Sequence, residues 1–224
     1  WALSLSGPPT WVQLFPSGVA PTGRSAHSAV YDSHRDQLII FGGGSGGPRD
    51  DAWALSLSGP LTWTQLPSAP AARALHTAIY DPRRERMVVF GGSYQNTTWA
   101  LYLSETPTWA VLSPAGTPPE GRIYHTAVWD TAGDRMLVFG GYNAEGQSMN
   151  QTWSLDLPGN GAWSVLTPAN APTGRHAHSA VYDLVRNRMI VFGGTSGGPT
   201  YLDETWILNL GTMTWSQETG GGSS

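Results

Sequence analysis

The chain has 224 residues, of which 40% are hydrophobic and only 12% are charged. This length fits one all-β domain. The low share of charged residues favours an extracellular setting without identifying the compartment. Its 12 basic residues are all arginine, its 16 acidic residues bring the net charge to -4, and no basic run is available for a nucleic acid or an anionic membrane. The absence of cysteine excludes disulfides and thiolate sites, and the apolar runs are too short for a membrane-spanning helix.

The segment RSAHSAVYDSHRDQLIIFGG, which begins at Arg24, is the first of four similar copies. The others begin at Arg73, Arg122 and Arg175. The histidines of the copies are separated by 49, 49 and 53 residues, and lie at His27, His76, His125 and His178. A period near 50 residues indicates an array of supersecondary units that bury their faces against one another.

Each copy predicts four short β-strands, which we term a to d in chain order. In the first copy, HSAVYD and DQLIIF predict strands a and b, and a Gly-Gly pair follows them. After a variable loop, WALSL and WTQL predict strands c and d, and a Pro-rich connection then leads to the next copy. Four antiparallel strands per unit, repeated radially, predict an all-β propeller with one blade per copy.

The positions that the copies share are expected to be structural. A glycine pair lets the chain leave a buried strand with backbone angles that other residues resist. All eleven tryptophans occupy repeat positions, which predicts that they pack between blades. The structural positions are the glycines Gly42, Gly43, Gly91, Gly92, Gly140, Gly141, Gly193 and Gly194, the tryptophans Trp53, Trp99, Trp153 and Trp206, and the arginines Arg24, Arg73, Arg122 and Arg175.

Together these features resemble the kelch repeat. The resemblance rests on the glycine pair after an apolar strand, the arginine three positions before the histidine, the Tyr-Asp or Trp-Asp that ends strand a, and the two spaced tryptophans. It covers roughly residues 1–217. It implies a β-propeller whose first strands line a central channel, and a role in binding another protein or a ligand through loops at one end.

The strand count predicts four complete blades and an N-terminal half blade. The blades fall at about 24–66, 73–112, 122–166 and 175–217, within a kelch domain at 1–218 that precedes a flexible Gly/Ser tail at 219–224. Trp1–Leu14 differs from Trp53–Leu66 at two positions and so supplies strands c and d alone. Because an open strand edge invites pairing, we expect either a segment of a longer propeller or self-association through residues 1–14 and the last blade.

The repeated titratable groups predict neither catalysis nor a metal site. Equivalent histidines on separate blades stand too far apart to reach one ion at about 2.0 to 2.1 Å, so each is expected to fix its d-to-a connection together with the arginine. Acid–base catalysis needs groups in unlike environments, whereas one aspartate per blade suits a turn former. These aspartates are Asp32, Asp81, Asp130 and Asp183. We expect no cofactor and no enzymatic activity.

Function is expected where the copies differ, in the b-to-c loops, which emerge at the same end of a propeller as the d-to-a connections. These loops carry aromatic and polar residues of the kinds that anchor interfaces, namely Arg49, Tyr94, Gln95, Tyr142, Asn143, Glu145 and Tyr201. We expect a non-enzymatic scaffold that binds a protein or glycan ligand with this end. The alternatives are a site at the opposite end, loops that serve only as solvated connectors, a purely structural repeat, and a hydrolase or lyase at the channel mouth.

Overall fold

The computed structural model describes residues 1–199 and 201–218, in which the regular secondary structure is β-strand throughout. The tail predicted at 219–224 lies outside the described residues. In the part of the chain that is described, no helix is long and apolar enough to cross a membrane.

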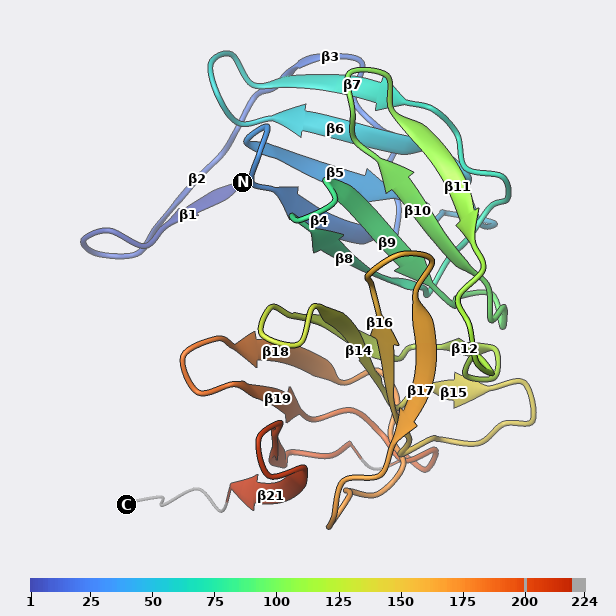
Figure 1. The fold of residues 1–224 in the computed structure, drawn as a ribbon. Helices are drawn as coiled ribbons and strands as arrows, with labels where there is room; N and C mark the ends of the chain where they lie inside the picture. The colour runs from blue at the N-terminus through green and yellow to red at the C-terminus, as the bar shows by residue number, and fades with distance from the viewer. Residues whose placement is uncertain (200, 219–224) are drawn as a thin grey trace.

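Four antiparallel sheets follow one another along the chain, each with its strands in sequence order (Figure 1). The first sheet contains β4 (Ser28–Asp32), β5 (Gln37–Phe41), β6 (Ala52–Ser56) and β7 (Thr62–Leu66). The second contains β8 (Thr77–Asp81), β9 (Arg86–Phe90), β10 (Thr98–Tyr102) and β11 (Thr108–Leu112). The third contains β13 (Thr126–Asp130), β14 (Arg135–Phe139), β16 (Thr152–Asp156) and β17 (Ala162–Leu166). The fourth contains β18 (Ser179–Asp183), β19 (Arg188–Phe192), β20 (Thr205–Asn209) and β21 (Thr214–Glu218).

Successive sheets meet through their first strands, which correspond to strand a. β4 contacts β8, β8 contacts β13, and β13 contacts β18, so these strands form the inner side of the array. On the outer side, β3 (Ser17–Gly18) pairs in parallel with β7, and single parallel bridges repeat this arrangement at Ala115 and Ala169. The connections into the first, third and fourth sheets therefore pass the outermost strand of that sheet before they enter it at the inside.

The hydrophobic core is divided into three clusters, one between each pair of neighbouring sheets. Between the first and second sheets, Ile39 and Phe41 of β5 pack against Met87, Val89 and Leu101. Side chains alternate along each strand, so in β9 and β14 one face enters the preceding cluster and the other face enters the following one. Burial on both faces explains why strand b is a continuous apolar run in the sequence.

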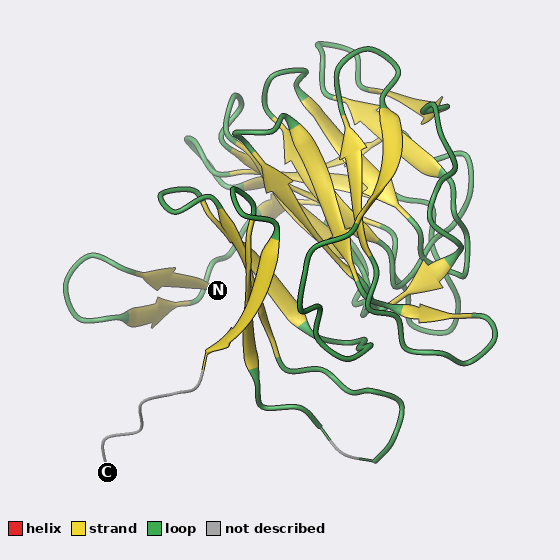
Figure 2. Cartoon of the chain, turned by 60° about the horizontal axis from the view of Figure 1, so that its bottom comes forward, coloured by secondary structure: helices red, strands yellow, loops and turns green. Residues whose placement is uncertain are grey.

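A hairpin of β1 (Ala2–Ser4) and β2 (Thr10–Val12) precedes the first sheet as a separate two-stranded sheet. It projects away from the other sheets in both views (Figures 1 and 2). Trp1 is 72% exposed and Trp11 is 63% exposed. The prediction that every tryptophan packs between blades is therefore wrong for these two, because β1 pairs only with β2 and has no inner strands beside it in the described chain.

Candidate functional site

One arginine per repeat ties each b-to-c loop to the connection that precedes the sheet. Arg24 donates from Nη1 to the carbonyl oxygen of Gly42 at 3.0 Å. The same contact to the first glycine of the pair recurs from Arg73, Arg122 and Arg175. The glycine pair itself is required by a close approach of backbone, since a Cβ on Gly43 would lie 2.3 Å from the carbonyl oxygen of Ser25.

The remaining side-chain contacts of the repeat arginine differ between sheets. Arg24 pairs with Asp51 at 2.6 Å, and Asp51 also accepts a hydrogen bond from Nε1 of Trp53 at 2.7 Å. These contacts, that of Arg24 foremost, lower the pKa of Asp51 to about 2. Arg73 instead lies over the ring of Trp99, 3.7 Å from its centroid, and burial lowers the pKa of this guanidinium to about 10. The guanidinium groups of buried arginines therefore anchor the b-to-c loops.

The b-to-c loops lie at the same end of the sheets as the d-to-a connections. Arg49 forms an antiparallel backbone bridge with Arg73, and Ser25 forms one with Gly44. At the third sheet the contact lengthens into a small sheet of β12 (Arg122–Ile123) and β15 (Tyr142–Asn143). We call this end the loop face, and define it by the b-to-c loops at 43–51, 92–97, 141–151, 195–199 and 201–204 together with the connections that lead into β4, β8, β13 and β18.

Four equivalent residues on the loop face adopt left-handed backbone angles. They are Ala26, Leu75, Tyr124 and Ala177, with φ between 55° and 61°. Each amide from Leu75 onward donates to the carbonyl oxygen of the preceding member, at 3.0, 3.4 and 2.9 Å. A non-glycine residue in this region costs on the order of 1 kcal/mol, which the hydrogen bonds offset. Tyr124 is the one aromatic residue among the four.

Tyr124 belongs to an aromatic cluster around His176. The His176 ring lies 6.0 Å from the ring of Tyr124 and 4.7 Å from that of Tyr142, measured between centroids. Its Nδ1 is 2.9 Å from the hydroxyl of Ser148, which orients the imidazole. Partial burial lowers the pKa of His176, so the ring is neutral at pH 7. With Tyr124 42% exposed, the cluster presents amphipathic surface to solvent.

A hollow lies beside this cluster on the loop face. Its volume is about 280 Å³, and its lining includes Ser25, Ala26, Gly47, Pro48, Leu75 and Tyr124. Pockets that enclose whole small molecules usually measure about 300 to 1,000 Å³. The hollow is therefore of a size to receive one or two side chains of a larger ligand.

The residues predicted to bind a ligand are spread over this face. Exposed side chains are found at Tyr94, Gln95, Glu145 and Tyr201, while Arg49 and Tyr142 are half-buried. Tyr142 enters the cluster around His176. Tyr201 joins it indirectly, because Thr195 bridges to both Tyr201 and His176 through the backbone. Asn143 is 3% exposed and hydrogen-bonds within its own loop to Gln147, so its side chain is not presented to a ligand.

Two members of the cluster were not among the predicted binding residues. Tyr124 and His176 lie in d-to-a connections, whereas the variable positions that were predicted to bind a ligand all lie in the b-to-c loops. A signal was present in the sequence, since Tyr124 stands where the other copies have alanine or leucine. The contact of the His176 ring with Tyr142 depends on the pairing of β12 with β15, which the repeat pattern does not contain.

The opposite end of the array carries a larger hollow of about 560 Å³ between the inner strands. Its aromatic lining comes from one position of strand a in each sheet, namely Tyr31, Tyr80, Trp129 and Tyr182. Tyr80 donates to Asp32 at 2.5 Å and Tyr182 donates to Asp130 at 2.9 Å. Burial and these hydrogen bonds raise the pKa of both tyrosines, so their protons are held in structural contacts.

The repeated histidines connect neighbouring sheets. Nε2 of His76 lies 2.8 Å from the hydroxyl of Ser28, one repeat earlier, and Nε2 of His125 lies 2.9 Å from that of Thr77. The expectation that each histidine fixes its own d-to-a connection was therefore incomplete, because the partner belongs to strand a of the preceding sheet. Among the described residues no three His, Asp or Glu side chains are placed to hold one metal ion.

The geometry defines a repeat protein in which equivalent four-stranded sheets display variable loops at one end. The KLHDC2/KLHL20/DRC7 Kelch-repeats domain matches residues 94–224, which is more than half of the chain. The chain therefore belongs to the kelch-repeat family. None of the curated proteins matches the chain at a significant level. Kelch repeats generally mediate protein–protein interactions and are typically non-enzymatic scaffolds.

Proposed function

We propose that the chain is a non-enzymatic binding module that recognises a protein ligand with its loop face. In this proposal residues 1–218 form one kelch domain, the four sheets are blades of a propeller, and Trp1–Leu14 is an outer half blade. The rigid part is the repeated framework of buried arginines and paired glycines. The variable part is the set of side chains that this framework holds at one end.

The observation that carries the proposal is the cluster of Tyr124, Tyr142 and His176 beside the hollow. Tyrosine supplies a large contact area at a low cost in conformational entropy, and it is enriched among residues that dominate binding energy. The hollow next to Tyr124 provides a recess for a protruding side chain of the ligand. Tyr94, Tyr201, Gln95, Glu145 and Arg49 then form the rim of the contact surface, where polar groups set specificity.

Two other assignments are less well supported. An enzyme of hydrolase or lyase type would need a pair of titratable groups with unlike environments, whereas the hollow at the opposite end is lined by tyrosines that are hydrogen-bonded to structural aspartates. A glycan ligand would also suit aromatic side chains. The protein ligand is preferred because protein binding is the general role of the family.

The test is a selection of ligands from a phage-displayed peptide library, run in parallel with a glycan array. We expect the chain to enrich peptides, and the double variant Tyr124→Ala, Tyr142→Ala to bind them at least about tenfold more weakly. The matched control is Leu184→Ser with Val185→Ser, two exposed residues in the a-to-b turn at the other end, which should leave binding unchanged. Thermal melting would establish that both variants are folded.

Three outcomes would contradict the proposal. Enrichment of glycans without peptides would reassign the ligand class. Equal binding by the loop-face variant and the parent chain would remove the cluster from the site. Loss of binding in the Leu184 and Val185 control alone would place the site at the opposite end.

A further inference from the structure

Neighbouring sheets are joined by a set of contacts with three elements, of which the first and third occur at all three interfaces and the second at two. Its first element is a histidine from one sheet that reaches a hydroxyl and a phenylalanine of the sheet before it. Nε2 of His76 is 2.8 Å from Oγ of Ser28, and its ring centroid is 4.9 Å from that of Phe41. The same pairs recur at the next two interfaces, as Thr77–His125 with Phe90 and Thr126–His178 with Phe139.

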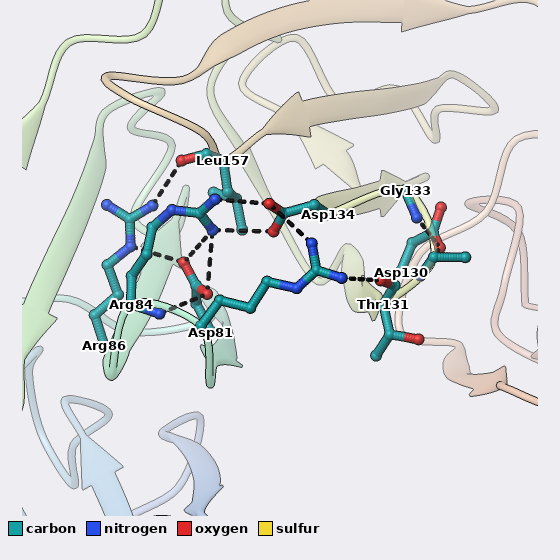
Figure 3. A network of polar contacts seen from close by, with 10 residues as sticks. Asp81, Arg84, Arg86, Asp130, Thr131, Gly133, Asp134 and Leu157 are labelled. Carbon is teal, nitrogen blue, oxygen red and sulfur yellow. Dashed lines mark hydrogen bonds and ion pairs between the residues drawn. The ribbon is translucent and has the colours of Figure 1, made fainter.

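The second element is an arginine in the a-to-b turn that binds acids of two sheets. Arg84 pairs with Asp81 of its own sheet at 3.0 Å and with Asp134 of the following sheet at 2.6 Å (Figure 3). Arg35 does the same one sheet earlier, with Asp32 at 3.2 Å and Glu85 at 2.5 Å. The third interface lacks this contact, since the corresponding residue of the third sheet is Gly133.

The third element is a pair of backbone hydrogen bonds at the loop face. The second glycine of each pair donates to the arginine carbonyl of the next repeat, as from Gly43 to Arg73 at 2.8 Å. The left-handed residues form the other bond, as from Leu75 to Ala26 at 3.0 Å. Every element is directional, because one sheet supplies the hydroxyl, phenylalanine and arginine while the next supplies the histidine and the acid.

The outer side of the fourth sheet carries the hydroxyl, the phenylalanine and the arginine of this set. These groups have no partner from a following sheet among the described residues. We call this outer side the C-terminal face and define it by Ser179, Asp183, Arg186, Phe192 and Gly194. Phe192 is 53% exposed, whereas the equivalent phenylalanines of the first three sheets are completely buried. Arg186 pairs with Asp183 of its own sheet at 3.2 Å, and its side chain is 65% exposed.

The outer side of the first sheet carries the complementary groups of the set, the histidine and the acid. We call it the N-terminal face and define it by Arg24, Ala26, His27, Tyr31 and Asp36. His27 is exposed, unlike the other three repeat histidines. Tyr31 donates to Asp36 of its own turn at 2.8 Å, whereas Tyr80 and Tyr182 donate to an aspartate of the sheet before them. No basic side chain of the described residues forms an ion pair with Asp36.

We propose that the C-terminal face of one copy of this chain binds the N-terminal face of a second copy, head to tail. In this contact Ser179 and Phe192 receive His27, Asp183 accepts from Tyr31, and Arg186 binds Asp36. The amide of Gly194 donates to the carbonyl of Arg24, and the amide of Ala26 donates to that of Ala177. Each pairing reproduces one that the chain already forms between its own sheets.

A recess on the C-terminal face supports this assignment independently. It has a volume of about 320 Å³, and its lining includes His178, Ser179, Phe192, Gly194, Tyr201 and Leu202. At the inner interfaces the imidazole of the next repeat occupies the corresponding position, against the phenylalanine ring and the hydroxyl of strand a. The recess is thus placed to receive His27 of a second copy.

The hairpin of β1 and β2 does not supply the missing partner. It repeats the sequence of strands c and d, so it contains no counterpart of the serine, aspartate, arginine or phenylalanine from strands a and b. Its tryptophans are exposed and it projects away from the first sheet (Figure 2). The fourth sheet of a second copy carries all of these groups on one surface. A head-to-tail contact of this kind yields a closed ring or an extended filament.

The test is the mass of the 224-residue chain, measured by sedimentation velocity over a series of concentrations. We expect the weight-average mass to rise above the monomer value of 24.0 kDa as the concentration increases. The charge reversals Asp36→Arg and Arg186→Glu, each made in a separate chain, should weaken association by about tenfold or more. An equimolar mixture of the two variants should restore it, because each chain then meets a complementary end.

A control variant separates this contact from a general effect of charge. Glu105→Arg changes the net charge by the same amount as Asp36→Arg, in an exposed turn between β10 and β11, and should associate like the parent chain. A parent chain that remains at 24.0 kDa throughout would overturn the proposal, and would leave both faces for a partner other than this chain. Single variants that associate as the parent does, or a mixture of folded variants that stays monomeric, would overturn it as well.

Discussion

The hairpin Trp1–Leu14 and the strand pair Trp53–Leu66 have almost the same sequence and very different surroundings. Trp1 is 72% exposed, whereas Trp53 is 7% exposed. β1 and β2 are three residues long, whereas β6 and β7 are five. The difference lies on the inner side of the pair, where β6 is hydrogen-bonded to β5 and β1 has no such neighbour in the described chain.

This comparison shows that the repeat motif encodes the hairpin locally and acquires its burial from neighbouring strands. The turn and the alternation are sufficient to pair β1 with β2 in the register of β6 with β7, since Leu3 faces Trp11 as Leu55 faces Trp63. They are not sufficient to bury the tryptophans, because most of their contact area comes from other strands and loops. A two-stranded hairpin alone is only marginally stable in water.

The largest expected effect comes from truncating the two equivalent tryptophans. Trp53→Ala removes a buried side chain together with its hydrogen bond to Asp51, and should lower the free energy of unfolding by about 3 to 5 kcal/mol. Trp1→Ala should change it by less than about 0.5 kcal/mol, because the side chain is mostly in water. Urea denaturation followed by circular dichroism would measure both. Equal losses would mean that the hairpin is packed in solution.

The sequence predicted the strands and sheets of this fold better than the contacts between neighbouring sheets. The period of the repeat, the apolar strand b and the glycine pair are local patterns, and they placed the four sheets because each strand is specified by its own residues. The half blade was expected for the same reason. What the pattern could not show is which groups of one repeat touch the next, as with the hydroxyl of Ser28 and the imidazole of His76, which are 48 residues apart.

The candidate site was predicted in part, for a related reason. Variation between copies pointed to Tyr94, Tyr142 and Tyr201 on the loop face, and the structure places all three there. It did not indicate Tyr124 or His176, whose role depends on the extra pairing of β12 with β15. Asn143 varies between the copies as well, yet its side chain is hydrogen-bonded to Gln147 of its own loop and to Glu120 of the preceding connection. Variability therefore locates a surface, whereas packing decides which side chains it presents.

The next prediction concerns the pH dependence of stability and compares a buried histidine with an exposed one. Burial, followed by the charge of Arg73, lowers the pKa of His76 to about 3 from its ordinary value of 6.5. Between these values the unfolded chain binds a proton that the folded chain does not, so the stability that is present above pH 6.5 is lost as the pH falls. For one such histidine the loss is about 2 kcal/mol at pH 5.

Substitution isolates this contribution. The decrease in unfolding free energy from pH 7 to pH 5 should be smaller by about 2 kcal/mol in His76→Gln than in the parent chain. His27→Gln should change that decrease less, because His27 is exposed, although partial burial and the charge of Arg24 lower its pKa in the same direction. The window ends near pH 5 so that carboxylates such as Asp51, whose pKa is about 2, remain ionised throughout. An unaltered pH dependence in His76→Gln would show that His76 is protonated in the folded state.

The smallest expected effect distinguishes the two serines that begin strand a in the first and fourth sheets. Ser28 is buried and its hydroxyl is 2.8 Å from Nε2 of His76, so Ser28→Ala leaves a buried nitrogen without its partner and should cost about 1 to 2 kcal/mol. Ser179 is exposed, and its hydroxyl makes no hydrogen bond within the described residues. Ser179→Ala should therefore leave the unfolding free energy unchanged in dilute solution, where the chain is monomeric.

If the two faces join at higher concentration, Ser179 gains the partner that Ser28 already has, and the alanine variant should become less stable than the parent chain as the concentration rises. The same pair of denaturation curves at both concentrations measures this change, and a difference that does not depend on concentration would assign Ser179 to the surface of a monomer.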